Sequence, residues 1–367
     1  MSGAKDSFVR RHPVLVLLGV NGLLLAVLLG VAELALRASV GWNPGYYTAV
    51  RASDTELEHP YGVIKINSLG FPDAEWDLSR ACKVGYFGDS VTYGVGAGYP
   101  YRISEIVEAA YPACEHLNLG GIGLSISARE IEHAVRLAGR FGLTDAVYLF
   151  NLNDILPDRA FSGELEPPSL RLRDQVVGSL DWLRGRSYLY TFLRTQAKTL
   201  LARHGVGFHG YSAYELEPRH NEAVLRETAG RINDFARALR EHGVALQLVI
   251  LPYEMQISAE AAERYAALGI HWEDGFLERG AQRVILPYLD PGLRVIDAYF
   301  AFLDDPEDPE PSRNANRLGQ YFVYDEGDSL DWNHPNREGH RRIGEYLVRE
   351  RIFGEPGAGH TLSRAAP

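Results

Sequence analysis

The sequence contains only two cysteines, Cys82 and Cys114, among its 367 residues. This scarcity excludes a disulfide-dense mini-scaffold and a zinc module held by four cysteines. Basic residues are fewer than acidic residues: the chain has 37 Lys and Arg and 48 Asp and Glu, which gives a net charge of −11. Nucleic-acid binding requires clustered cations that contact phosphates, so we expect no nucleic-acid partner. Apolar residues make up 46% of the chain, enough for a sizeable core, which excludes wholesale disorder.

Long hydrophobic runs are absent with one exception, Pro13–Ala32. A helix of that length without a charge measures about 30 Å, the thickness of a bilayer core. A secretory signal usually has an apolar core of about 7–15 residues and a small-residue cleavage site, whereas Glu-Leu-Ala-Leu-Arg follows this run. Three basic residues precede it, which predicts a cytoplasmic N-terminus over 1–12. We expect a single-pass transmembrane anchor over 13–36, with a cleaved signal or a buried core helix as alternatives.

Short apolar runs alternate with helical periodicity along the rest of the chain. We expect five strands, near residues 83–87, 116–119, 146–150, 244–251 and 293–296. Strands that alternate with helices predict a parallel sheet covered on both faces. The expected fold is therefore a three-layer, doubly wound α/β domain of the flavodoxin-like type. Ligands in such folds bind at the carboxyl ends of the strands.

Composition divides the chain into segments. We expect a connector over 37–81, the α/β domain over 82–353 and a flexible tail over 354–367. An insertion over 155–215 interrupts the alternation, and between 170 and 204 seven basic residues stand against two acidic ones. This local positive charge predicts either a solvated helix face or contact with lipid headgroups or an anionic glycan. With the anchor in place, the domain would be periplasmic or extracellular.

Ser90 follows the first predicted strand directly and precedes a helix, whose N-terminus favours developing negative charge. Near the other end of the chain, Asp331 stands three residues before His334, on a loop ahead of a predicted helix that Pro335 would begin. A serine hydroxyl is a weak nucleophile unless a base takes its proton and a third group orients that base. The α/β-hydrolase elbow would place glycine where Thr92 stands, so that fold is disfavoured.

Four ordered blocks of the sequence resemble the SGNH hydrolases, also called the GDSL lipase/esterase superfamily. The blocks are GDSVTYG at 88–94, NLGGIG at 118–123, NLND at 151–154 and DWNH at 331–334. The resemblance covers residues 82–350. It implies a catalytic triad of Ser90, His334 and Asp331, with Asp325 or Asp328 as fallback partners of the histidine.

The same resemblance implies an oxyanion hole. Its donors would be the backbone N–H groups of Ser90 and Gly120 and the side-chain amide of Asn153. Losing one such donor typically costs about 2.7–4 kcal/mol of transition-state stabilisation. Asn151 departs from the family pattern, which has glycine there, and we expect its side chain near the acyl group. Asp89 and Asp154 are the other residues expected close to the substrate.

The two cysteines occupy matched positions in the predicted sheet. Cys82 lies six residues before Gly88, and Cys114 lies six residues before Gly120. If these glycines end neighbouring strands at one level, the cysteines are level too, at a separation that suits a disulfide. An exported domain would oxidise the pair. A bridge and two buried thiols are both compatible with the sequence.

Three functions are compatible with these motifs. The first is a serine esterase that acts on an extracytoplasmic ester, such as an O-acetylated cell-envelope polysaccharide. The others are an O-acyltransferase with the same triad and an inactive glycan-binding module. The stretch Asn67–Phe71 resembles the connector of membrane-anchored bacterial SGNH proteins, which implies a link to envelope polysaccharide machinery. We expect no metal and no cofactor, and we expect His340 to be a packed or capping histidine.

Overall fold

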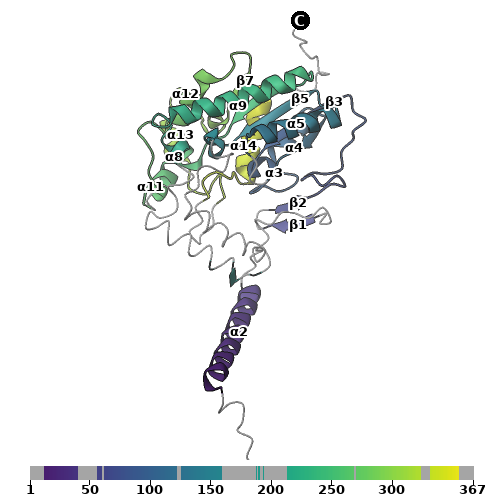
Figure 1. Cartoon of the computed structure of the whole chain (residues 1–367). Coiled ribbons are helices and arrows are strands. Elements are labelled where there is room, and N and C mark those ends of the chain that lie inside the picture. The colour runs from purple at the N-terminus through teal and green to yellow at the C-terminus, as the bar shows by residue number, and fades with distance from the viewer. Residues whose placement is uncertain are drawn as a thin grey trace, which may run out of the picture. The chain divides into compact units, whose positions relative to one another are not determined.

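The structure is a computed structural model of the 367-residue chain (Figure 1). It separates into two compact units, residues 1–48 with 172–197, and residues 49–171 with 198–367. The residues that the structure describes are 12–39, 56–59, 62–121, 125–158, 187, 189–190, 193, 213–267, 270–323 and 331–354.

Five parallel strands form the sheet of the larger unit, in the order β4-β3-β5-β6-β7. Each lies within two residues of its predicted bounds, and together they are β3 (Cys82–Gly88), β4 (Cys114–Asn118), β5 (Asp145–Phe150), β6 (Ala245–Ile250) and β7 (Arg294–Asp297). β4 and β5 are buried throughout, and β5 is apolar after Asp145, whereas β4 also buries Glu115, His116 and Asn118. The predicted doubly wound α/β fold is confirmed. Strand order reverses between β3 and β5, where such folds bind ligands.

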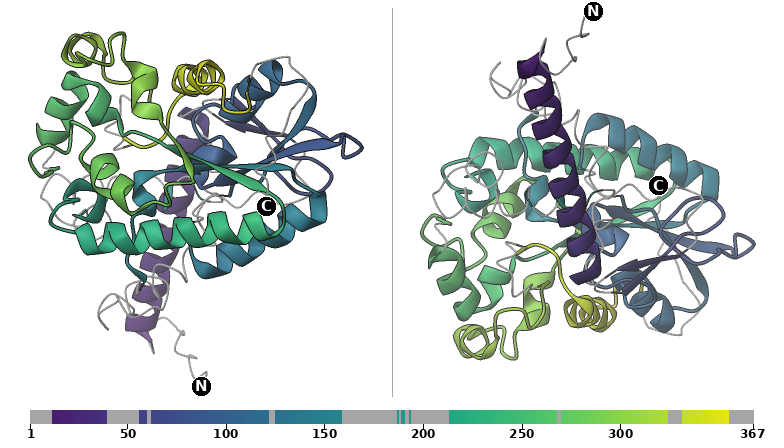
Figure 2. Two further views of the ribbon diagram at one scale, coloured as in Figure 1. Left: turned by 90° about the horizontal axis from the view of Figure 1, so that it is seen from above. Right: turned by 90° about the horizontal axis from the view of Figure 1, so that it is seen from below.

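Helices cover both faces of the sheet, as Figure 2 shows. α5 (Ala128–Phe141) and α9 (Glu222–Glu241) pack into one apolar core, and α4 (Ile103–Ala110) and α14 (Arg337–Arg349) pack into the other. Ser127 caps α5, with its hydroxyl accepting a first-turn N–H at 3.2 Å. The shorter helices are α3 (Ser90–Tyr93), η2 (Leu152–Asp154), α8 (Ala213–Leu216), α10 (Glu254–Ile257), α11 (Ala259–Ala267), α12 (Gly280–Ile285), η5 (Leu286–Tyr288), η6 (Ala298–Phe302) and α13 (Glu310–Ala315).

The predicted connector contains structure that the sequence did not indicate. β1 (Glu56–His59) and β2 (Gly62–Lys65) form an antiparallel hairpin. The rings of Phe71 and Trp76 then pack against Phe141 of α5, with centroids 5.7 and 5.3 Å from that ring. The chain just before β3 is therefore folded onto the α/β unit.

The smaller unit contains α2 (Pro13–Ser39). Its segment Pro13–Ala35 is long and apolar enough to cross a membrane, with a mean hydropathy of 2.7, and it is exposed along its length. The alternative of a buried core helix is therefore wrong. Glu33 on α2 accepts hydrogen bonds from the Ser187 hydroxyl at 2.9 Å and the Leu189 N–H at 2.8 Å. The seven basic residues of the insertion lie outside the described residues.

Cys82 and Cys114 face each other across β3 and β4. The strand register pairs them directly, and their Cα atoms lie 4.6 Å apart. Their sulfurs are joined in a disulfide. Of the two alternatives that the sequence left open, the structure has the bridge.

Candidate active site

Ser90 stands where β3 ends and α3 begins. Gly88 closes the strand at a φ of +144°, and a side chain there would meet the Leu149 carbonyl oxygen at 2.7 Å. Asp89 then caps α3, and its Oδ1 accepts the Val91 N–H at 2.9 Å. This tight turn leaves Ser90 partly exposed at the carboxyl edge of the sheet.

A line of hydrogen bonds joins Ser90, His334 and Asp331. The Nε2 atom of His334 lies 2.7 Å from the Ser90 Oγ, and its Nδ1 lies 2.6 Å from the Asp331 Oδ1. A carboxylate only accepts, so Nδ1 is the donor in that pair and Nε2 is left to accept from the serine hydroxyl. The geometry therefore brings together the three residues that the sequence proposed as a triad.

The loop that contains His334 is fixed at several points. The Val323 N–H donates to the His334 carbonyl at 2.9 Å. α14 begins at Arg337 rather than at Pro335, and Asn336 caps it, because the Asn336 side chain accepts two N–H groups of the first turn. Gly96 has a φ of +96°, and a side chain there would collide with the Pro335 carbonyl. The absent Cβ lets the loop after α3 approach the histidine loop closely.

Two carboxylates raise the pKa of His334 above its ordinary 6.5. Burial is the largest single influence and acts the other way, because desolvation disfavours the charged imidazole. The charge and hydrogen bond of Asp331, with the charge of Asp89, outweigh burial. A raised pKa makes the neutral ring a stronger acceptor for the serine proton.

Several solved structures are similar to this chain. A member of the lipolytic G-D-S-L family from Veillonella parvula is 14% identical, with 74% of this chain and 99% of that chain covered and a TM-score of 0.37. A carbohydrate acetylesterase from Sinorhizobium meliloti is 12% identical, with 73% and 97% covered and a TM-score of 0.36. A psychrotrophic esterase from Pseudoalteromonas sp. is 11% identical, with 74% and 97% covered and a TM-score of 0.34.

Solved structures of G-D-S-L-family proteins and esterases resemble this chain. No family model and no curated protein matches it.

A buried polar cluster supports Ser90 from inside the protein. Asn151 is fully buried and donates to the Asp89 Oδ2 at 3.1 Å. Asp154 accepts the Tyr148 hydroxyl at 2.8 Å. Burial raises the pKa of both carboxyls. The Asn151 side chain thus bonds to the residue that precedes Ser90, and its expected position near the acyl group stays a prediction.

Gly120 is placed differently from its predicted role as an oxyanion donor. Its N–H donates to the Asn118 Oδ1 at 3.0 Å, so this donor is already engaged within the turn. A side chain at Gly120 would meet the Tyr93 backbone nitrogen at 2.6 Å, so the glycine serves close packing against α3. Asn118 begins the NLGGIG block, but sequence reasoning gave it no role; its side chain also donates to the Thr92 carbonyl at 2.6 Å. Its place at the head of that block was the signal available for it.

His340 lies on α14 and is fully buried. Its Nδ1 accepts the Ile103 N–H at 3.3 Å, at the start of α4. Burial, followed by the positive charge of Arg102, lowers the pKa of His340 to about 3, so the ring is neutral at physiological pH. It is a capping histidine, as the sequence predicted.

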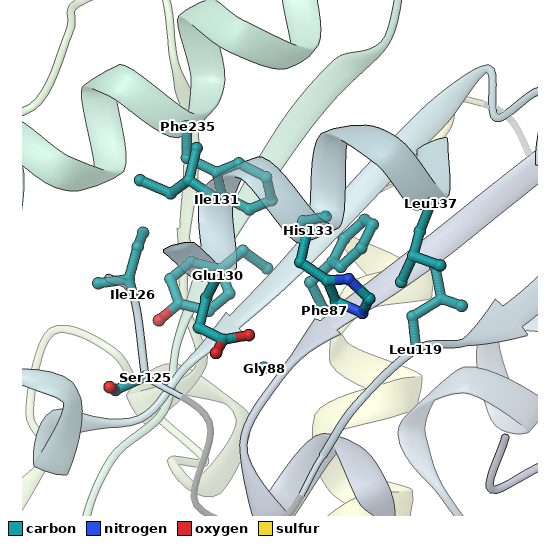
Figure 3. A pocket seen from close by; sticks show the side chains of 12 residues that line it. Phe87, Gly88, Leu119, Ser125, Ile126, Glu130, Ile131, His133, Leu137 and Phe235 are labelled. Carbon is teal, nitrogen blue, oxygen red and sulfur yellow. The ribbon is translucent and has the colours of Figure 1, made fainter. Parts of the chain in front are cut away.

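An apolar pocket borders the end of β3 (Figure 3). Its cavity volume is about 40 Å³, and Gly88 lies in its wall two residues before Ser90. Most of its lining is apolar and comes from the sheet, α5 and α9, with Phe87, Leu119, Ile126, Ile131, Ala134, Leu137, Tyr148 and Phe235. Glu130, His133 and Ser125 add polar groups. A group that enters this pocket must be largely apolar.

Proposed function

We propose that this protein is a serine esterase of the SGNH type that acts through an acyl-enzyme at Ser90. The hydrogen-bonded line from Ser90 through His334 to Asp331 is the observation on which the proposal rests. A buried carboxylate on one imidazole nitrogen and a serine hydroxyl on the other is the arrangement that activates a serine nucleophile.

In the proposed mechanism, the Ser90 Oγ attacks the carbonyl carbon of the ester while His334 takes the hydroxyl proton. Collapse of the tetrahedral intermediate breaks the bond to the alkoxy oxygen, and His334 gives its proton to the leaving alcohol. Water then attacks the acyl-serine with the same histidine as base, which releases the carboxylic acid and restores the serine. Asp331 holds the ring orientation and stabilises the imidazolium throughout.

Two donors suit the oxyanion in this mechanism. The Ser90 N–H is at the start of α3, and the Asn153 side-chain amide has two N–H groups that it can donate. The Gly120 N–H could join them only by leaving the Asn118 Oδ1. Preorganised donors of this kind account for much of the rate enhancement in acyl transfer.

The proposed substrate is an O-acetylated polysaccharide outside the cytoplasm. Two observations support that location. The segment Pro13–Ala35 could anchor the chain, and basic residues precede it. The Cys82–Cys114 disulfide is typical of domains that fold in an oxidising compartment.

Incubation of the full chain in detergent micelles with acetylated xylan and an unacetylated oligosaccharide tests this proposal. We expect free acetate from the wild type and none from Ser90→Ala. Acetyl groups on the oligosaccharide would identify an acyltransferase instead. Retention of xylan by both proteins, without turnover, would identify a binding module and contradict the esterase.

A further inference from the structure

Asp73, in the segment before β3, bonds to the end of β4. Its Oδ2 accepts the Asn118 N–H at 2.9 Å. The Asn118 side chain in turn donates to the Thr92 carbonyl at 2.6 Å and accepts the Gly120 N–H at 3.0 Å. Thr92 belongs to α3, the helix that begins with Ser90. A short chain of hydrogen bonds therefore connects Asp73 to the end of β4 and to α3, the helix that begins with the nucleophile.

Asp73 is itself fixed by several partners. It is only 5% exposed, and Arg102, which is 1% exposed, lies 3.2 Å from its Oδ1. The Trp76 indole donates to its Oδ2 at 2.7 Å, and the Ala74 N–H donates to its Oδ1 at 2.8 Å. Arg102 also pairs with Glu105 in the first turn of α4. An exposed connector does not require several buried, charged hydrogen bonds on one carboxylate, so these contacts indicate a specific structural role for Asp73.

The turn that presents Asp73 is built by Asn67. The Asn67 Oδ1 accepts the N–H groups of Leu69 at 3.1 Å and Phe71 at 3.0 Å, and its Nδ2 donates to the Ala74 carbonyl at 3.3 Å. Asparagine favours such turns because its short side chain bonds to its own backbone. The stretch from Asn67 to Phe71 therefore has a definite role, which is to deliver Asp73 to the strand end.

We propose that Asp73 is a positioning residue of the active site. Asp73 holds the turn at Asn118 against α3 and thereby determines the position of that turn relative to Ser90. The proposal rests on the proposed function, since it takes Ser90 as the nucleophile. Burial raises the pKa of Asp73 to about 6 despite the opposing charge of Arg102, so the carboxylate is ionised above neutral pH. Removing it would leave the buried Asn118 N–H without its charged acceptor.

The test measures how fast a fluorophosphonate modifies Ser90 in the full chain, in detergent micelles, at a series of probe concentrations. This separates the maximal rate of modification from the probe affinity. The variants are Asp73→Ala, Asn118→Ala, their double mutant and the control Glu105→Gln. The control weakens the ion pairs of Arg102 but keeps the acceptor of the Asn118 N–H.

We expect Asp73→Ala to lower the maximal rate about tenfold or more, with the probe affinity changed less than about twofold. Glu105→Gln should stay within about twofold of the wild type, and the double mutant should be no slower than the slower single mutant. If Asp73→Ala does not fold, Asp73→Asn is measured instead, and a rate below the wild-type value is expected.

Wild-type rates in a folded Asp73 variant would overturn the positioning role alone. Equal losses in Asp73→Ala and Glu105→Gln would also overturn it, because they would reflect general destabilisation of the Arg102 cluster. Failure of the probe to modify wild-type Ser90 would instead contradict the proposed function, so the two failures are distinguishable.

Discussion

At the scale of single residues, the ionisation of a buried carboxyl group depends on the groups that surround it. Asp331 is 7% exposed and bonds to His334, where its charge stabilises the imidazolium. Glu215 is 2% exposed and hydrogen-bonds to the Tyr253 hydroxyl at 3.2 Å. The first carboxylate faces a group that becomes positively charged, whereas the second faces a neutral phenol. These surroundings predict different responses to pH.

The residue Asp331 should control the pH dependence of Ser90. Only the neutral imidazole accepts the serine proton, so modification of Ser90 by a fluorophosphonate should accelerate as pH rises through the pKa of His334, which lies above 6.5. Asp331→Asn removes the charge that raises this pKa, so the midpoint should move to lower pH. The plateau rate should fall by about 10³–10⁴-fold, since the ring loses its orientation. An unchanged midpoint in a folded variant would contradict the role of Asp331.

Glu215 should lower the stability of the fold as pH rises. Burial raises its pKa to about 8 from 4.5, so the folded chain retains a proton that the unfolded chain releases between these values. The free energy of unfolding should therefore fall across this window, by at most about 1.4 kcal/mol per pH unit. Glu215→Gln cannot ionise, so its Tm relative to the wild type should increase from pH 5 to pH 8. Thermal melts at both pH values measure this.

The matched control is Glu241→Gln, which changes an exposed side chain at the end of α9. Its Tm difference from the wild type should be similar at both pH values. A Glu215→Gln difference that also stays constant with pH would contradict the buried, protonated carboxyl.

At the scale of elements, the disulfide ties two neighbouring strands that are distant along the chain. Cys82 and Cys114 are separated by 32 residues, and a closed loop of this length should stabilise the fold by about 3–4 kcal/mol through the entropy of the unfolded chain. Urea unfolding with dithiothreitol should show this loss for the wild type. The double variant Cys82→Ala/Cys114→Ala should be insensitive to the reductant. Two titratable thiols in the unreduced, unfolded protein would refute the bridge.

The elements of the sheet could be predicted because short apolar runs alternate with helical periodicity along the chain, although β4 and β7 also contain polar or charged residues. The hairpin of β1 and β2 could not, because the segments Glu56–His59 and Gly62–Lys65 are short, and the first of them is largely polar. Ser90 and His334 could be proposed as partners because each was expected on a loop directly before a helix. The direction of the Asn151 side chain and the engagement of the Gly120 N–H depend on contacts across the fold, which spacing alone does not reveal.

At the scale of the whole molecule, α2 is the feature that determines where the proposed chemistry takes place. The segment Pro13–Ala35 is exposed and apolar, and the mainly acidic α/β unit follows it in the chain. If the helix spans the membrane with its basic flank inside, the site lies outside the cytoplasm. An esterified envelope glycan would then be within its reach.

The proposed membrane anchor at Pro13–Ala35 predicts how the chain fractionates. The full chain should stay in the membrane after extraction with alkaline carbonate, and a C-terminal alkaline phosphatase fusion should be active. Deletion of residues 1–39 should leave a protein that is not membrane-bound, as a matched control. Release of the full chain by carbonate, or cleavage after the apolar run, would indicate a signal sequence instead.

The central claim is that Ser90 is a nucleophile activated by His334. Reaction of the folded full chain with a fluorophosphonate, followed by mass spectrometry of its peptides, tests it most directly. We predict modification of the wild type at Ser90, none at that site in Ser90→Ala, and a loss of at least about 10³-fold in rate in His334→Ala. An unmodified Ser90 in the folded wild type, or equal rates in the wild type and His334→Ala, would contradict the claim.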